Sequence, residues 1–271
     1  MNTRFSMVLP DTDARDGVRL ARDTEALLVE QERMMSRFIA HGDLATVNRH
    51  ACGGPVPVPD GLWDILLACK RHHGLTEGAF DIAQGSRGGR HGMDQVRFDP
   101  AARTLQFAAP GMRLDLGGIG KGIALEKVRQ HLLDRNVRDA FLSFGESSVS
   151  VIGTHPAGDC WPVGVEDLFR AGHSLHRFDL RDASMSTSGN REGQEHVIDP
   201  STGKPVTGCQ TLSVACACAI DAEVLSTALL VLPASRRAAV LQNYAGVQAV
   251  HIVYRQRDGT WAGEKEWQYE E

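Results

Sequence analysis

The spacing of apolar residues changes in blocks along this chain. Residues 16–40 carry apolar positions at helical intervals, including Leu27, Leu28 and Met34, and such spacing is typical of an amphipathic helix. Residues 59–73 follow the same pattern, with Asp60 predicted as the N-cap. Because helices and strands come in clusters and do not strictly alternate, the pattern favours an α+β fold over a doubly wound parallel sheet.

The other expected elements follow from the same periodicities. Strands are predicted over residues 95–99, 104–108, 112–116, 139–145, 147–155, 161–167, 174–182, 211–219 and 248–255, and helices over residues 122–136, 222–232 and 235–244. The glycine-rich basic segment 85–94 is predicted to be a surface loop. No internal repeat, low-complexity linker or break in composition occurs, so residues 1–271 are expected to form one domain.

Composition and charge exclude several classes of protein. Apolar residues make up 42% of the chain and charged residues 23%, as in ordinary soluble globular proteins. The net charge is −5 and no basic stripe occurs, which argues against a nucleic-acid surface.

No apolar run approaches the roughly 20 residues that span a bilayer, so no transmembrane segment is expected. Residues 1–17 lack the apolar part of a signal peptide. The chain as given is therefore expected to be cytoplasmic, and periplasmic if a leader was removed from a longer precursor.

Cysteine usage fits a reducing compartment. Cys216 and Cys218 lie in the alternating segment 211–219, where both sulfurs would point to one face. No second Cys/His pair has zinc-like spacing, so buried structural thiols are favoured over metal ligands.

A run of glycines around one lysine follows the segment 112–116. Residues 115–128 read DLGGIGKGIALEKV. Glycine lets a backbone approach a ligand closely, and helix N-termini attract anions. The spacing fits neither a Walker A loop nor a dinucleotide fingerprint, because Lys121 is followed by Gly122 and Asp115 stands where Walker A requires glycine. By itself the segment indicates either a phosphate contact or a tight turn from strand to helix.

A second polar cluster spans residues 186–206. Two hydroxyl-glycine pairs, Ser188-Gly189 and Thr202-Gly203, are predicted as turns on either side of His196 and Asp199. Asp199 either stabilises its own turn or contributes to a site. His196 is a candidate general base, with a structural histidine as the alternative.

A third candidate site lies on the helix expected near residue 222. With Asp221 as its N-cap, Glu223 and Thr227 fall at i and i+4 on one face. A carboxylate and a hydroxyl are hard oxygen donors that suit magnesium. Alternatively, Glu223 complements the helix N-terminus and Thr227 is buried filler.

In this order, the three segments resemble the motifs of the ApbE family of flavin transferases, which move FMN from FAD onto a protein threonine. Residues 115–122 are similar to the family pattern DLGGIAKG, residues 187–205 to TSG…HHIIDPxTGxP, and residues 222–229 to ADAxATAL. Upstream, residues 75–85 resemble TdGaFDptvgp and residues 35–50 resemble lSxyxxxSelsrlN. The resemblance covers nearly the whole chain. It implies a single compact α+β domain of the family's T-fold-like type, with FAD in a cleft.

The resemblance also implies roles for individual residues. The implied FAD-binding set is Asp81, Gly117, Gly118, Lys121, Thr187, Ser188, Gly189 and Asp199, with Lys121 and its neighbouring glycines at the pyrophosphate. The implied magnesium ligands are the Gly120 carbonyl, Glu223 and Thr227. His196 matches the second histidine of the family's pair and would be the base that deprotonates the acceptor threonine.

The implied reaction transfers FMN from FAD to a serine or threonine hydroxyl of an acceptor flavoprotein with a Ser/Thr-Ala-Thr type motif, and releases AMP. Magnesium would neutralise charge on the pyrophosphate. A positioned base contributes a factor of roughly 10²–10⁴. If water replaced the protein hydroxyl, the same site would be a magnesium-dependent FAD pyrophosphatase.

Several family positions differ here. The metal-site aspartate of the family is Glu223, and the alanine of its glycine loop is Gly120. The other departures are Glu146 and Ser147 in place of the last two residues of GGD, Glu195 in place of the first histidine, and Ser143 in place of an asparagine. Because His196, Lys121 and Thr227 remain, a divergent transferase is expected. The alternative is an FAD-binding protein whose metal site has decayed.

Overall fold

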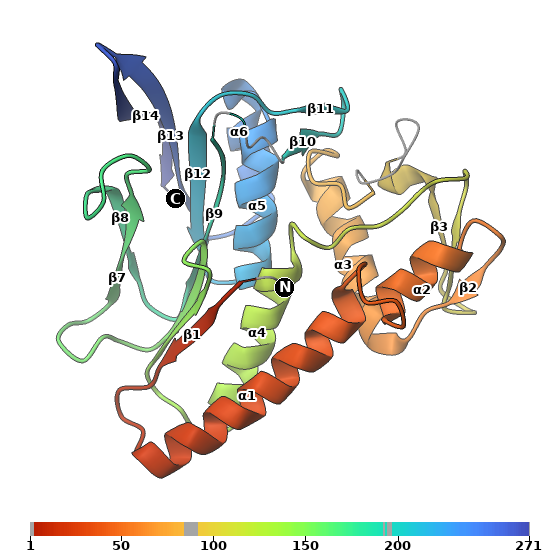
Figure 1. Ribbon diagram of the computed structural model, residues 1–271, viewed down its shortest axis with the longest axis horizontal. Coiled ribbons are helices and arrows are strands. Elements are labelled where there is room, and N and C mark those ends of the chain that lie inside the picture. Colours follow the sequence, from red (N-terminus) through yellow and green to blue (C-terminus); the bar gives the residue numbers. More distant parts are fainter. Residues whose placement is uncertain (1–2, 84–91, 192, 194–196, 271) are drawn as a thin grey trace.

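A seven-stranded antiparallel sheet forms the centre of the protein (Figure 1). The computed structural model describes residues 3–83, 92–191, 193 and 197–270. The strand order is β1-β5-β6-β9-β12-β13-β14. The strands span Phe5–Val8 (β1), Ala140–Phe144 (β5), Ser148–Ile152 (β6), Ser184–Asn190 (β9), Gln210–Cys216 (β12), Gln248–Arg257 (β13) and Thr260–Glu270 (β14).

The described residues form three smaller strand groups beside this sheet. They are the sheet of β2 (Val56–Pro57), β4 (Thr104–Phe107) and β3 (Val96–Asp99), the hairpin of β7 (Trp161–Glu166) and β8 (Ser174–Leu180), and the pair β10 (Ile198–Asp199) and β11 (Lys204–Pro205). The helices are α1 (Ala14–Met35), α2 (Asp43–His50), α3 (Asp60–Leu75), α4 (Gly120–Leu133), α5 (Ala219–Val231) and α6 (Ala234–Leu241), with a 3₁₀ turn at Met93–Gln95.

The central sheet is covered on both faces. Helices α4 and α5 lie along one face, and the β7–β8 hairpin covers the other (Figure 1). The alternation of side chains along a strand explains this. In β6, Val149 and Val151 pack into the cluster with Trp161 and Phe178 of the hairpin. Ser148, which directly precedes Val149 and so faces the other way, points toward α5, where its hydroxyl meets Glu223.

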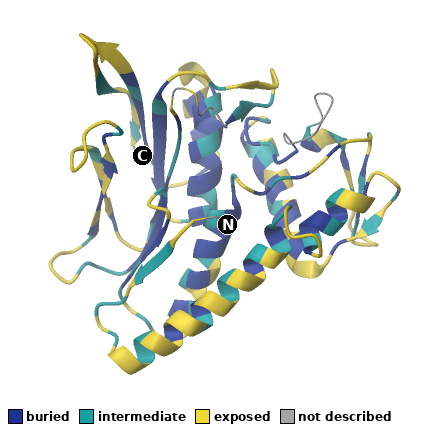
Figure 2. Ribbon diagram, viewed as in Figure 1, coloured by how far each residue is buried: buried dark blue, intermediate teal, exposed yellow. Residues whose placement is uncertain are grey.

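Helix α5 is buried on almost every side, and Figure 2 shows it dark blue along most of its length. A helix that is apolar nearly all round must lie inside a protein. Val224, Leu225 and Leu229 belong to the same apolar cluster as Leu62 and Leu66 of α3. The helix therefore separates the central sheet from the α3 layer and carries its polar side chains into the interior.

The α+β class predicted from the sequence is confirmed, but some local predictions are wrong. Residues 112–116 are not a strand. Their backbone groups bond elsewhere: Leu114 pairs with the Asn48 side chain and the Asp115 N–H donates to the Ile82 carbonyl at 2.7 Å. Ser188-Gly189 is not a turn but lies within β9.

Two predicted N-caps are also wrong by a few residues. Pro59 caps α3 and Asp60 is its first helical residue. Cys218 caps α5, so Asp221 lies in the first turn. Since β12 ends at Cys216, Cys218 does not share a strand face with it, although both thiols are free and at least half-buried. Helix α1 ends at Met35, five residues before the predicted end.

In the part of the chain that the structure describes, no helix combines the length and apolar character needed to cross a membrane.

Candidate functional site

A cavity of about 820 Å³ brings together the three polar segments that the sequence singled out. Gly117, Gly118 and Lys121 line it from the start of α4, and Glu223 and Thr227 line it from α5. The remaining wall comes mainly from the β9 and β10 regions and from the segment before residue 84, namely Ala79, Phe80, Asp81, Ile82, Thr187, Ser188, Gly189, Val197, Ile198 and Pro200, with Arg37, Asp115 and Ser147 at the edges.

The glycine loop approaches α5 closely. A Cβ on Gly118 would lie 3.8 Å from Thr227 Oγ1 and 3.6 Å from the Phe80 ring. A Cβ on Gly122 would lie 2.5 Å from the Ala219 carbonyl oxygen and 3.0 Å from Glu223 Cγ. Only glycine fits at Gly122 without moving backbone. The close crossing of α4 and α5 therefore depends on this residue, and it brings Lys121 to Glu223.

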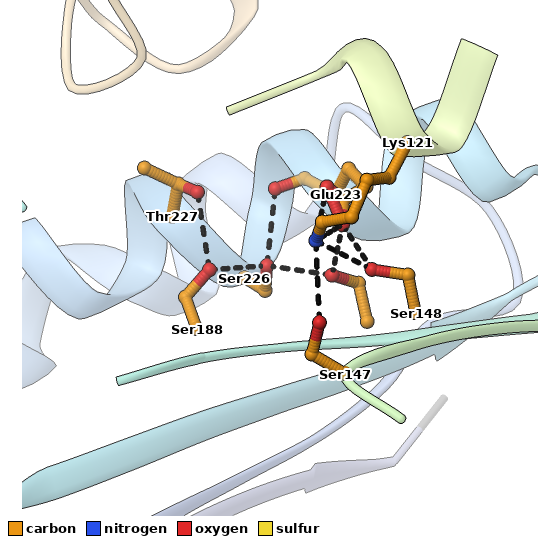
Figure 3. A network of polar contacts seen from close by, with 8 residues as sticks. Lys121, Ser147, Ser148, Ser188, Glu223, Ser226 and Thr227 are labelled. Atoms are coloured by element: carbon orange, nitrogen blue, oxygen red, sulfur yellow. Dashed lines mark hydrogen bonds and ion pairs between the residues drawn. The ribbon is translucent and has the colours of Figure 1, made fainter. Parts of the chain in front are cut away.

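Glu223 carries a buried charge that three side chains satisfy (Figure 3). Its Oε1 lies 2.5 Å from Lys121 Nζ and accepts a hydrogen bond from Ser186 Oγ at 2.9 Å and another from Ser148 Oγ. The Glu223 side chain is 4% exposed and that of Lys121 is 24% exposed. Burying a carboxylate is costly unless it is paired and hydrogen-bonded. The serines and the ammonium meet that requirement here.

A chain of hydroxyls continues from Glu223 to the cavity (Figure 3). Ser226 Oγ lies 3.2 Å from Ser186 Oγ and 2.8 Å from Ser188 Oγ, and Ser188 Oγ lies 3.1 Å from Thr227 Oγ1. Thr227 is thus part of a polar network at the cavity wall and is not filler. The i, i+4 placement of Glu223 and Thr227 on one helix face, predicted from the sequence, is confirmed.

The model of the ApbE family matches residues 1–251. The chain belongs to the ApbE family. A protein named FAD:protein FMN transferase from Treponema pallidum is 29% identical to it over 88% of this chain and 78% of its own length. One of the same name from Rhodobacter capsulatus is 31% identical over 72% of this chain and 43% of its own length.

Two solved ApbE structures resemble this one closely in fold. The flavin transferase ApbE from Vibrio cholerae superposes with a TM-score of 0.80 at 22% identity, over 98% of this chain and 94% of that chain. The ApbE protein from Thermotoga maritima gives 0.79 at 23% identity, over 97% and 93%. At these identities the likeness establishes the ApbE fold, which is the architecture that the motifs implied.

Magnesium, which the ApbE motifs imply, suits the donor types present. Glu223 and Thr227 are hard oxygen donors on one helix face, and both line the cavity. The buried Glu223 carboxylate already holds a cation, the Lys121 ammonium, so the position favours positive charge. Gly120 does not line this cavity; it lies in the wall of an adjoining one of about 380 Å³ with Met35 and Ile39. Among the described residues, no cluster of three His, Cys, Asp or Glu side chains forms a metal site.

Asp81 supports the cavity wall with its carboxylate. The Ala83 and Met93 N–H groups donate to it at 2.7 and 2.9 Å, and His73 Nε2 lies 3.4 Å away. The hydrogen bond to Asp81 raises the pKa of His73 above its ordinary value. Asp81 therefore lies in the cavity wall, and its carboxylate orders the backbone behind it.

Asp199 stabilises its own turn, one of the two roles open from the sequence. Its carboxylate accepts from the Ser201 N–H and hydroxyl and from the Thr202 hydroxyl, each at 2.8 Å. Burial would raise the pKa of Asp199, but these hydrogen bonds outweigh it and the pKa is lowered. The neighbours Ile198 and Pro200 line the cavity and Asp199 does not.

The other predicted residues are divided between the two faces of β9. Ser188 points toward Thr227, while the hydroxyl of Thr187 bonds Ser213 at 2.7 Å. Gly189 is packed against β12, because a Cβ there would lie 2.6 Å from the Gln210 carbonyl oxygen. His196, the predicted base, lies outside the described residues; Val197, next in the chain, lines the cavity.

Sequence reasoning missed two sets of residues that build the site. Asn48 holds the segment before the glycine loop: its Nδ2 donates to the Leu114 carbonyl at 2.9 Å and its Oδ1 accepts from the Leu114 N–H at 2.7 Å. Asn48 matches the final asparagine of the family pattern lSxyxxxSelsrlN, and that match was the available signal. Ser148 and Ser186 donate hydrogen bonds to Glu223. The available indication was that serines occupy alternate positions along residues 148–150 and 184–188.

Proposed function

We propose that this protein is a magnesium-dependent FAD:protein FMN transferase, which moves FMN from FAD to a threonine or serine hydroxyl of an acceptor protein and releases AMP. The observation that carries the proposal is the single cavity in which the glycine loop, the β9 hydroxyls and the Glu223–Thr227 face of α5 converge. These are the three segments whose motifs match the family. The relatives named FAD:protein FMN transferase support the same activity.

The glycine loop is suited to a pyrophosphate. Gly117 and Gly118 carry no side chain between the cavity and their backbone, and Lys121, the second residue of α4, supplies a positive charge. A helix N-terminus and a lysine together favour a polyanion. The pyrophosphate of FAD would therefore be held at this end of the cavity, and Phe80, Asp81 and Ser188 would lie on the flavin side.

The transfer is a substitution at the phosphorus on the FMN side of FAD. The acceptor hydroxyl oxygen forms a new O–P bond, and the bond from this phosphorus to the bridging oxygen breaks. AMP leaves with that oxygen and its electron pair, and His196 takes the hydroxyl proton. Glu223 and Thr227 would hold magnesium, which supplies charge neutralisation at the pyrophosphate when bound. The acceptor segment would carry a Ser/Thr-Ala-Thr type motif, and the protein would act in the cytoplasm, or in the periplasm as part of an exported precursor.

Chromatography of FAD and AMP tests the proposal. The purified protein is incubated with FAD and MgCl₂, with and without a peptide bearing the Ser/Thr-Ala-Thr motif. Peptide-dependent AMP release, abolished by EDTA, is the expected result. AMP release of equal rate without peptide would indicate an FAD pyrophosphatase. FAD that is bound but stays intact at every magnesium concentration would indicate an FAD-binding protein and contradict catalysis.

A further inference from the structure

The Lys121 ammonium lies on the carboxylate that would bind the metal. Lys121 Nζ is 2.5 Å from Glu223 Oε1 and 3.3 Å from Oε2, so it contacts both carboxylate oxygens. Ser148 Oγ accepts a hydrogen bond from the same ammonium at 2.7 Å, and Ser147 Oγ lies 3.3 Å from it. The ammonium is thus held by four oxygen atoms, as a bound cation would be.

Two cations cannot use this carboxylate in the same way. Magnesium binds oxygen ligands at about 2.0–2.1 Å and demands near-octahedral geometry. Oε1 of Glu223 already contacts Lys121, Ser148 and Ser186, and among the described residues only Lys121 contacts Oε2. A metal ion at Oε2 would lie against the ammonium, and like charges in a partly buried site repel strongly. Withdrawal of Lys121 would remove this repulsion and leave Oε2 of Glu223 open to a metal ion.

Lys121 is the more exposed member of the pair and borders the cavity. The Lys121 side chain lines the cavity and is 24% exposed, whereas the Glu223 side chain is only 4% exposed. A lysine side chain is a compact charge on a flexible stem with three rotatable donors. The backbone of Gly117 and Gly118 lies in the same cavity wall. An anion held there would offer the ammonium new acceptors within the same cavity.

We infer that Lys121 is a stand-in cation that couples the binding of FAD to the binding of the metal. In the ligand-free protein the ammonium occupies Glu223 and excludes a divalent ion. When the FAD pyrophosphate enters, the ammonium transfers to it and frees Glu223 for the metal. This inference rests on the proposed function only in taking FAD as the pyrophosphate ligand.

Such an exchange makes the two ligands bind cooperatively. By linkage, FAD must raise the affinity for the metal by the same factor by which the metal raises the affinity for FAD. Removing Lys121 should break the coupling: the ligand-free protein should bind the metal more tightly, because the buried Glu223 charge has lost its partner. The same change should weaken FAD binding, because the pyrophosphate has lost a cation.

The experiment measures Mn²⁺ binding from the electron paramagnetic resonance signal of the free ion, with and without FAD, in His196→Ala protein to prevent turnover. Lys121→Met in that background is expected to raise the Mn²⁺ affinity of FAD-free protein by about tenfold or more, within the usual range of coupling. FAD is expected to raise Mn²⁺ affinity by a similar factor in the parent and by less than about threefold in Lys121→Met.

Two variants serve as controls. Lys127→Met removes a lysine from the same helix and should leave both Mn²⁺ affinities unchanged. Lys121→Arg keeps the positive charge and should keep the low FAD-free affinity, which separates the charge from any general damage to the fold. Unchanged or weaker Mn²⁺ binding in FAD-free Lys121→Met protein would overturn the inference. Failure of every variant to bind FAD would contradict the proposed function instead, and the FAD-free comparison would still decide the role of Lys121.

Discussion

Lys121 and Glu223 are separated by 102 positions in the chain, yet their charged atoms lie 2.5 Å apart at the base of the cavity. The contact exists because α4 and α5 cross closely at Gly122 and because two serines from the sheet hold the carboxylate. The pair connects the glycine loop to the Glu223–Thr227 face of α5. It is therefore a structural element as well as part of the proposed site.

Replacing either member of this pair should lower the free energy of unfolding. Removing one partner of a buried ion pair costs about 3–5 kcal/mol, and less is expected here because Lys121 is partly exposed. Glu223→Gln and Lys121→Met are each expected to cost about 1–3 kcal/mol. Because the double variant leaves no unpaired charge, its cost should be smaller than the sum of the two. Urea unfolding measures all three, and additive costs would mean that the two charges do not interact.

Gly122→Ala should force α4 and α5 apart. The new Cβ would meet the Ala219 carbonyl oxygen at 2.5 Å, and overpacking of this kind costs about 1–3 kcal/mol. Gly74→Ala is the matched control, because α3 leaves open space there and alanine favours a helix. Thermal unfolding should show a loss for Gly122→Ala and none for Gly74→Ala. If Gly122→Ala melted at the same temperature as the unchanged protein, Gly122 would not be what allows α4 and α5 to pack closely.

Asn48→Ala should loosen the segment that leads into the glycine loop. It would leave the buried Leu114 N–H and carbonyl without their partner, and unsatisfied buried groups cost about 1–3 kcal/mol. FAD affinity, measured by flavin fluorescence, should fall together with stability. Asn243→Ala loses one exposed bond to the Leu75 carbonyl and should change neither. An unchanged FAD affinity in Asn48→Ala would contradict a role for this segment in FAD binding.

Stability should fall as the pH is lowered from about 6.5 to 4, in part because of His72. Burial, followed by the charge of Arg71, lowers the pKa of His72 from 6.5 to about 4. Between these values the unfolded chain binds a proton that the folded protein does not, so acid favours unfolding. His72→Gln should therefore lose less stability over this window than the unchanged protein, whereas His50→Gln, at an exposed position, should follow the unchanged protein. Stability is measured from melting temperatures across this pH range. An equal fall in melting temperature for His72→Gln and the unchanged protein would contradict a neutral buried His72.

The fold class and several residues that line the cavity were predictable because both leave local patterns. Periodicity marked α4, α5 and most strands of the sheet, and the i, i+4 spacing placed Glu223 beside Thr227. The strand β9 was missed because its residues, SMSTSGN, are small and polar. Such residues are typical of turns. Only the pairing with β6 and β12 and the hydroxyl network with α5 show that they form a strand.

The pairing of charges within the site was not predictable from spacing. Lys121 was expected at a pyrophosphate and Glu223 at a metal, and no local pattern indicates that they meet each other. Their contact depends on the crossing of two helices that are far apart in the chain. Similarly, residues 112–116 have the composition of a strand, but the side chain of Asn48 takes the place of a neighbouring strand.

The most direct test of the proposed activity is the intact mass of an acceptor peptide after incubation with the protein, FAD and MgCl₂. The mass should increase by one FMN with loss of water, and the flavin should stay attached after denaturation. Replacing the acceptor threonine by valine, or using His196→Ala protein, should abolish the increase, and His196→Ala protein should still bind FAD. An unmodified threonine peptide in the presence of bound FAD, magnesium and the unchanged protein would contradict the assignment of FMN transfer.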